Sequence, residues 1–177
     1  MKKDHWGSHM AVFRILLGLI VVLVLASCAQ KPESKFRSYH GPEVTRVVVH
    51  KGVRQMELWH HDQVLRIFRV DLGGDPNGHK AREGDRRTPE GHYVIDRRNP
   101  NSRFHLSIGI DYPNEADVAR AAANGWRPGG DIFIHGRGPR FAGANGDWTE
   151  GCIAVSDREM EDIYAMVRNG TPISIYP

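Results

Sequence analysis

Residues 132–155 read IFIHGRGPRFAGANGDWTEGCIAV. It opens with a short apolar run, passes a histidine and a glycine-rich segment, and reaches a cysteine that follows a glycine. A short apolar run bounded by glycine is typical of a buried β-strand. The pattern predicts a strand over residues 131–134 and a loop that is long enough to bring Cys152 back beside His135.

His135 and Cys152 are candidates for a base and a nucleophile, seventeen residues apart. A cysteine nucleophile needs a partner that takes its proton or lowers its pKa, and histidine is the usual one. Gly151 permits a tight turn, and backbone N–H groups there can receive the oxyanion of a tetrahedral intermediate. Residue types and spacing alone leave open the alternative that Cys152 is a small buried apolar side chain.

The N-terminal 27 residues have the outline of a signal peptide. Residues 15–26 are almost uniformly apolar and follow basic residues, but they are too short for the roughly 30 Å hydrocarbon core of a membrane. The sequence Leu25-Ala26-Ser27-Cys28 resembles the lipobox of bacterial lipoproteins, in which the cysteine carries lipid. We therefore expect a signal peptide at 1–27 and a periplasm-facing lipoprotein anchored at Cys28, with the outer membrane favoured. Ordinary cleavage and an uncleaved membrane anchor are the alternatives.

Composition limits the remaining function classes. The chain has 177 residues, 40% of them hydrophobic and 25% charged, which fits one globular domain. A net charge of +3 without a clustered basic face argues against nucleic-acid binding. No His-Glu-x-x-His or cysteine cluster indicates a metal site. If Cys28 carries lipid, Cys152 is the one free thiol of a 150-residue mature chain in an oxidising compartment, which favours a function for it.

The polar residues 28–43 are expected to form a tether, and the domain is expected to span 44–177. A long ordered loop is predicted over 72–90. The apolar patterns predict strands at 44–50, 55–59, 64–70, 92–96, 104–110, 131–134 and 172–176. Two helices are expected, at 115–124 after Asn114 and at 157–168 after a Ser156–Glu159 capping box.

His135-Gly136, the seventeen-residue spacing and Thr149-x-Gly151-Cys152 resemble the active-site motif of the YkuD-type L,D-transpeptidases. Residues 87–93, RTPEGHY, are similar to the T-P-x-G-x-Y pattern of that family. The resemblance implies a mainly β fold, a sandwich or open barrel with one or two peripheral α-helices. It also implies cysteine-dependent acyl transfer on peptidoglycan stem peptides without any cofactor.

The same resemblance assigns roles to individual residues. Cys152 matches the nucleophile, His135 the general base, and Gly136 the position whose backbone orients the histidine. Trp148, Thr149 and Glu150, which precede the Gly151 turn, are expected to contact substrate.

Two positions depart from the common family motif. Glu150 stands where most members have histidine, and Ala154 stands where most have arginine or asparagine. In both respects the chain resembles a YafK-like branch of the family. Three functions stay open: a transpeptidase that cross-links peptidoglycan or attaches an envelope protein, a hydrolase of peptidoglycan or of its lipoprotein link, and a non-catalytic peptidoglycan-binding lipoprotein.

Overall fold

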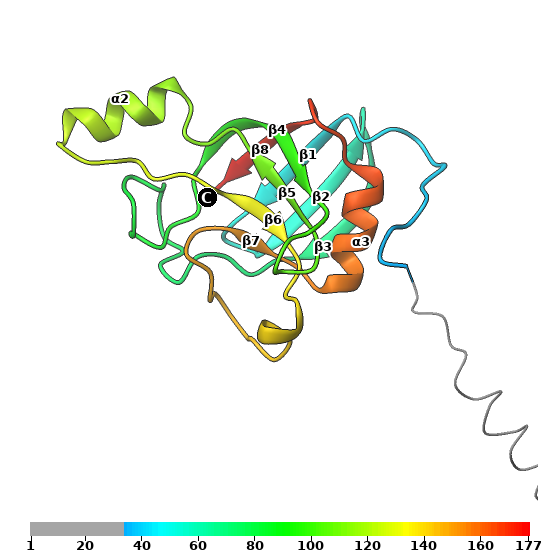
Figure 1. Cartoon of the computed structure of the whole chain (residues 1–177). Helices are drawn as coiled ribbons and strands as arrows, with labels where there is room; N and C mark the ends of the chain where they lie inside the picture. Colours follow the sequence, from blue (N-terminus) through cyan, green and yellow to red (C-terminus); the bar gives the residue numbers. More distant parts are fainter. Residues whose placement is uncertain (1–33) are drawn as a thin grey trace, which may run out of the picture. The chain divides into compact units, whose positions relative to one another are not determined.

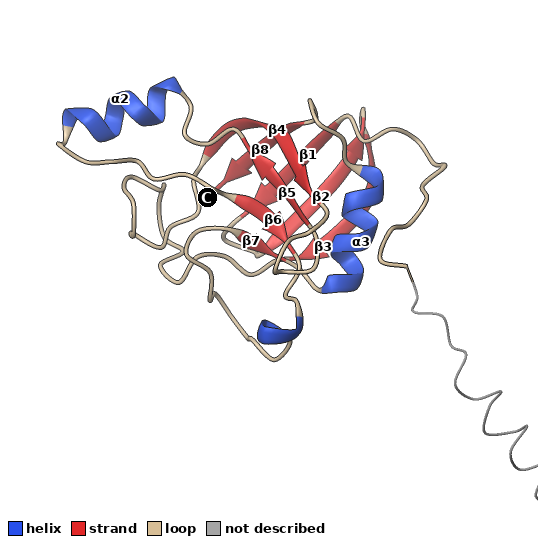
Figure 2. Cartoon of the chain, in the orientation of Figure 1, coloured by secondary structure: helices blue, strands red, loops and turns tan. Residues whose placement is uncertain are grey.

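The computed structural model describes residues 34–177, and Figures 1 and 2 show a curled β-sheet with helices at its margins. Within this range the elements are β1 (Arg46–His50), β2 (Gln55–His60), β3 (Gln63–Arg69), β4 (Gly91–Asn99), β5 (Ser107–Ile110), α2 (Glu115–Ala123), β6 (Phe133–His135), a 3₁₀ turn (Pro139–Phe141), β7 (Ile153–Ala154), α3 (Asp157–Met166) and β8 (Pro172–Tyr176). The predicted mainly β fold with peripheral helices is confirmed.

The strands of the described chain form one sheet in the order β3-β2-β1-β8-β4-β5-β6-β7. The pairs β1–β8 and β6–β7 are parallel and the others are antiparallel. The long strand β4 pairs with β8 through its first half and with β5 through its second half, and its register shifts between Ile95 and Arg97. Irregularities of this kind bend a strand, which lets the sheet curl around its core.

The core follows from strand alternation. Val47 and Val49 of β1 are fully buried, as are Met56 and Leu58 of β2, while the residues between them are partly exposed. By contrast, all four residues of β5 are buried: α3 contacts this strand, and the Arg97 side chain lies over Gly109. On α3 the spacing of Met160, Ile163 and Met166 places three buried side chains on one helix face.

Both helices begin where the capping residues predicted. The Asn114 side chain accepts a hydrogen bond from the Asp117 N–H, and the Ser156 hydroxyl accepts one from the Glu159 N–H. Both ends form a capping box, which satisfies backbone donors that a helix start would otherwise leave unpaired. The second helix ends two residues earlier than expected, at Met166.

The first described residues belong to the predicted tether at 28–43, and several of them contact the domain. Lys35 donates to the carbonyl oxygens of Pro100 and His105, at 2.6 and 3.2 Å. Arg37 forms ion pairs of 2.7 Å with two acidic residues of α3, Glu161 and Asp162. The segment from residue 35 onward therefore packs on the domain. The predicted signal peptide and Cys28 lie outside the described residues, and no helix within 34–177 is long and apolar enough to cross a membrane.

Candidate active site

Strand pairing puts the two predicted reactive residues on one face of the sheet. β6 and β7 run parallel, with Ile134 opposite Ile153. Continuing that register by one residue places Cys152 opposite Phe133. Side chains alternate between faces, so Phe133, His135 and Cys152 share a face while the two isoleucines point into the core. His135 is then the diagonal neighbour of Cys152, and diagonal neighbours lie about 7–8 Å apart, within reach of an aromatic ring.

The cysteine segment is also held along its other edge. Asp71 forms an antiparallel bridge with Ala154, and their backbone N–H groups donate to each other's carbonyl oxygens at 2.9 and 2.8 Å. The Thr149 N–H donates to the Leu72 carbonyl at 3.1 Å, and the Gly74 N–H donates to the Thr149 carbonyl at 3.0 Å. The start of the long loop predicted from residue 72 thus serves as a short extra strand that fixes the segment around Cys152.

Thr149 braces the turn that carries the nucleophile. Its hydroxyl donates to the Cys152 carbonyl at 2.7 Å and accepts from the Gly151 N–H at 3.1 Å. The residue is only 4% exposed. The Thr149 hydroxyl therefore positions the turn from inside the protein, and the expectation that Thr149 contacts substrate stays a prediction.

Gly151 has a positive φ, as its predicted place in a tight turn requires. Its φ is +127°, and a Cβ there would lie 2.6 Å from the Arg87 carbonyl oxygen. Its N–H donates to Thr149, however, and is not free to receive an oxyanion. Of the two backbone N–H groups predicted to bind the oxyanion at this turn, the Cys152 N–H is therefore the better candidate.

The Cys152 thiol contacts the backbone of the strand beside it. Sγ lies 3.4 Å from both the Phe133 N–H, which donates to it, and the Asp131 carbonyl oxygen, which accepts from it. Burial raises the pKa of the thiol from its ordinary value of 9.0 to about 11, and the Phe133 N–H only partly offsets this increase. The resting cysteine is a neutral thiol at physiological pH.

His135 is 3% exposed and is held in one tautomer. Its Nδ1 lies 2.5 Å from the Gly136 carbonyl oxygen, which can only accept, so Nδ1 carries a proton and Nε2 of the neutral ring is the proton acceptor. Burial lowers the pKa of His135 below its ordinary value of 6.5, and the Gly136 carbonyl acts in the opposite direction. The neutral ring therefore predominates at physiological pH.

Aromatic side chains enclose the imidazole. The Phe104 ring stacks on it with centroids 4.4 Å apart, and the Trp148 indole meets it edge-on at 5.7 Å. Trp148 in turn stacks on Phe141 at 4.7 Å. The indole N–H of Trp148 is buried and has no hydrogen-bond acceptor among the described residues. Trp148, which was expected to contact substrate, thus forms part of the wall behind the histidine.

The loop after His135 is fixed from the start of α3. The Asp157 carboxylate accepts hydrogen bonds from the backbone N–H groups of Arg137 and Gly138, at 2.6 and 2.9 Å. Gly136 lies so close that a Cβ there would approach the same carboxylate to 2.5 Å. The Arg137 side chain forms an ion pair of 2.5 Å with Asp71, which belongs to the short extra strand on the other side of Cys152. Two elements far apart in sequence therefore fix the loop that follows the histidine.

Residues 44–175 match the YkuD family, the L,D-transpeptidase catalytic domain. The chain belongs to this family. In the described part of the domain, no group of three histidine, cysteine, aspartate or glutamate side chains is placed to hold a metal ion.

Relatives of this YkuD domain agree with the family assignment. The Escherichia coli K12 protein named "Putative L,D-transpeptidase YafK" is 31% identical over 125 residues, which cover 65% of this chain and 45% of YafK. The helical cell shape determining protein Pgp2 of Campylobacter jejuni shares the fold, with a TM-score of 0.58 and 24% identity over 82% of this chain and 51% of Pgp2. The L,D-transpeptidase of Mycobacterium smegmatis does so with a TM-score of 0.51 and 15% identity, over 76% of this chain and 59% of that protein. The chain spans about half the length of the relatives it matches.

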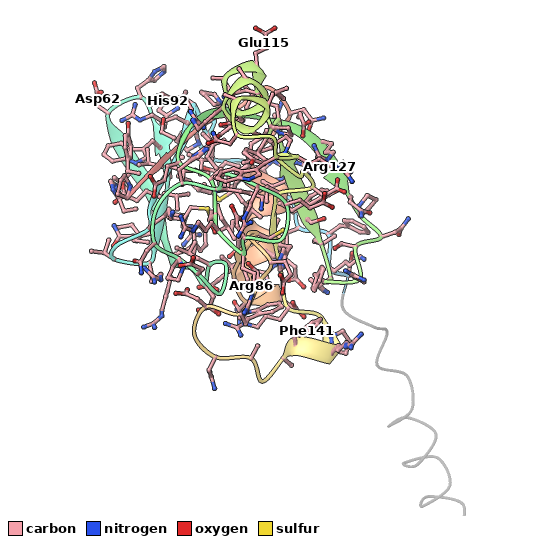
Figure 3. The ribbon with its side chains drawn as sticks, turned by 90° about the vertical axis from the view of Figure 1, so that its left-hand side faces the viewer. Asp62, Arg86, His92, Glu115, Arg127 and Phe141 are labelled. Atoms are coloured by element: carbon pink, nitrogen blue, oxygen red, sulfur yellow. The ribbon has the colours of Figure 1, made fainter. Side chains whose placement is uncertain are left out.

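The two departures from the common motif of the YkuD family have different surroundings. Glu150 is largely exposed, with 78% of its side chain accessible, and it lies 3.5 Å from Arg86 across the mouth of the site. Figure 3 shows Arg86 on a loop above the one that carries Phe141. Ala154 is fully buried between two strands, so no side chain extends from that position toward the thiol.

Several residues of the site were not found from the sequence. Asp157 was recognised only as the first residue of a helix, and Asp71 lay between the predicted strand at 64–70 and the predicted loop at 72–90. The Phe104 ring stacks on the histidine, and Phe141 stacks on Trp148 beside it; no spacing in the sequence connects either phenylalanine to the site. Their roles depend on contacts between segments that are distant along the chain.

Proposed function

We propose that the protein is a cysteine acyl transferase acting on peptidoglycan stem peptides, with Cys152 as nucleophile and His135 as general base. The observation that supports this most strongly is that strand register places a thiol and a histidine of fixed tautomer as neighbours on one face of β6 and β7. Nδ1–H of His135 is committed to the Gly136 carbonyl, which leaves Nε2 to take a proton. Membership of the YkuD family supplies the substrate class.

The mechanism begins from a neutral pair. Cys152 attacks the carbonyl at the L-centre of diaminopimelate while Nε2 of His135 takes the thiol proton, and the Cys152 N–H stabilises the oxyanion. The tetrahedral intermediate collapses to a thioester. The imidazolium passes its proton to the leaving amine of the terminal D-alanine. Because Nδ1–H stays bound to Gly136, the ring keeps its orientation through both proton transfers.

The second half of the reaction depends on what attacks the thioester. An amine of another stem peptide gives a cross-link, and a lysine of an envelope protein gives protein attachment. Water gives hydrolysis instead, of peptidoglycan or of its link to a lipoprotein. We propose transpeptidation as the main reaction, in a lipoprotein anchored through Cys28 on the periplasmic side, with the outer membrane as its site.

Acylation can be tested by intact mass after incubation with a carbapenem, which acylates members of this family. We expect one adduct on the wild-type chain and none on Cys152→Ala. Cys28→Ala serves as the matched control and should be labelled fully, because it removes the other thiol of the chain. An adduct of undiminished yield on Cys152→Ala, or none on the wild type, would contradict the enzyme assignment and favour a non-catalytic binding protein.

The fate of the thioester can be tested with purified disaccharide-tetrapeptide and mass analysis of the products. A cross-linked dimer is the expected product. A tripeptide released by water without any dimer would replace transpeptidation with hydrolysis while keeping the same nucleophile. For the anchor, membrane fractionation should show that Cys28→Ala releases the protein, and continued membrane association would indicate an uncleaved helix.

A further inference from the structure

Arg97 reaches the active-site face from a strand two places away. It lies on β4, opposite Gly109 of β5. A Cβ on Gly109 would fall 2.6 Å from Cγ and 2.8 Å from Cζ of Arg97, so the missing side chain is what lets Arg97 lie flat across β5. The guanidinium then rests 4.5 Å over the ring of Phe133 on β6. The N–H of Phe133 contacts the Cys152 thiol.

Part of the guanidinium is already fixed by the protein. Nη1 donates to both carboxylate oxygens of Asp96, at 2.9 and 2.8 Å, and to the Ile110 carbonyl at 3.2 Å. Nη2 faces Asp131 at 3.6 Å, beyond the length of a good hydrogen bond, and the Asp131 side chain is 93% exposed. Arg97 is thus held in place from one side and keeps a weakly occupied donor on the other.

Arg97 also lines a cavity that is linked to the active site through Asp131. The cavity has a volume of about 560 Å³ and is bounded by Arg97, Asp131 and the loop around Arg127 and Gly130. Asp131 joins it to the active site, because its carbonyl accepts from the Cys152 thiol at 3.4 Å. Figure 3 shows Arg127 beside the sheet, on the side of the molecule that faces the viewer. The cavity is open, and its size suits a short peptide segment.

The charged groups near the thiol include the same two residues, Arg97 and Asp131. Among the groups that act on the pKa of Cys152, Asp131 raises it, and Lys80 and Arg97 lower it. Lys80 is 3% exposed and pairs with Asp85 at 2.8 Å, so its charge is neutralised inside the loop. Arg97 is 37% exposed and faces the cavity. Unlike Lys80, Arg97 therefore presents a cation that a ligand in the cavity can reach.

We propose that Arg97 is a specificity-determining residue that binds a free carboxylate of the acyl donor, next to the carbonyl that Cys152 attacks. This assignment rests on the proposed function. Arginine suits the task because its planar fork binds a carboxylate with two parallel hydrogen bonds. Ala154 leaves no side chain on its own strand to do so. In the bound state the carboxylate displaces Asp131 from Nη2. Nη1 remains on Asp96.

A diaminopimelate tetrapeptide offers two such carboxylates, the C-terminal one of the leaving D-alanine and the one on the diaminopimelate side chain. The test measures kcat/KM for the free tetrapeptide, for its C-terminal amide and for the peptide amidated on diaminopimelate, with wild type and Arg97→Gln. We expect Arg97→Gln to lower kcat/KM for the free peptide by about 10–100-fold, mainly through KM. One of the amides should be turned over equally by both proteins, which identifies the carboxylate that Arg97 binds.

Two controls accompany the comparison. Arg46→Gln changes an arginine that also lies over an aromatic ring, 4.4 Å from the centre of Trp59, but it belongs to β1 and does not line the cavity, so it should alter kcat/KM less than about threefold. Arg97→Lys keeps the charge but not the fork, so partial activity is expected. It also covers the case in which the glutamine variant fails to fold, which thermal unfolding would reveal.

The outcomes separate this assignment from the proposed function. Equal loss on the free peptide and on both amides would overturn the carboxylate role, since the effect would then be structural. An unchanged kcat/KM in Arg97→Gln would overturn it as well. If the wild type turned over none of the peptides and formed no carbapenem adduct, the acyl-transfer proposal itself would fail, and the Arg97 assignment with it.

Discussion

The replacement His135→Asn tests whether the histidine acts as a general base or as the cationic half of an ion pair. The raised pKa of Cys152 and the lowered pKa of His135 both favour the neutral pair. In an ion pair, removal of the histidine would raise the pKa of the thiol. In a neutral pair it would leave that pKa almost unchanged and impair only the step in which the proton is transferred.

The magnitudes follow from the shift of the thiol. With a pKa of about 11 instead of 9.0, the thiolate fraction of Cys152 at pH 8 falls from about one in ten to about one in a thousand. A more basic thiolate is also a better nucleophile, which returns up to about tenfold of that loss. The alkylation rate at a single pH therefore says little about the pKa of Cys152, whereas the pH at which the rate stops rising reports it directly.

The assay is alkylation by iodoacetamide from pH 6 to 10.5, read by mass spectrometry on the tryptic peptide 141–158, which separates Cys152 from Cys28. We expect the rate to rise about tenfold per pH unit up to pH 10, both in wild type and in His135→Asn. Acylation by the peptide substrate should fall about 10²–10⁴-fold in the variant. His92→Asn, a change at a histidine bonded to Ser174 on β8, is the control.

A plateau of the wild-type alkylation rate below pH 8.5, together with a higher midpoint in His135→Asn, would refute the neutral pair. That result would show a thiolate already formed in the resting protein, stabilised by an imidazolium.

Three further outcomes are expected. Because burial lowers the pKa of His135 and its neutral ring is the base, kcat/KM should decline only below pH 6.5 as the ring is protonated; an acid limb centred above 6.5 would contradict this. Thr149→Val should lower kcat about 10-fold and stability by about 1–2 kcal/mol by urea unfolding, since it removes two hydrogen bonds of the turn, whereas Thr149→Ser should retain most of both. Gly151→Ala should lower the free energy of unfolding by about 1–3 kcal/mol, because φ is +127° and the new Cβ meets the Arg87 carbonyl. An unchanged midpoint of urea unfolding would contradict this.

Most strands and both helices followed from local pattern, because alternation and capping act over a few residues. The Ser156–Glu159 box is one example. The strand β7 was not predicted, since Ile153 and Ala154 are too few to show a period and become a strand only between β6 and residue 71. The predicted strand at 104–110 begins only at Ser107, because the residues before it turn toward the histidine, where Phe104 stacks.

The sequence by itself determined the family, the mainly β fold and the candidacy of His135 and Cys152, because a motif of fixed spacing carries that information locally. Only the tertiary structure decided what surrounds them. Burial sets the protonation of both groups, and the Thr149 hydroxyl braces the turn that carries Cys152. Arg97 extends across a glycine of the neighbouring strand to lie over Phe133 on the active-site face. Burial and contacts between strands depend on how distant segments pack, and no local pattern encodes them.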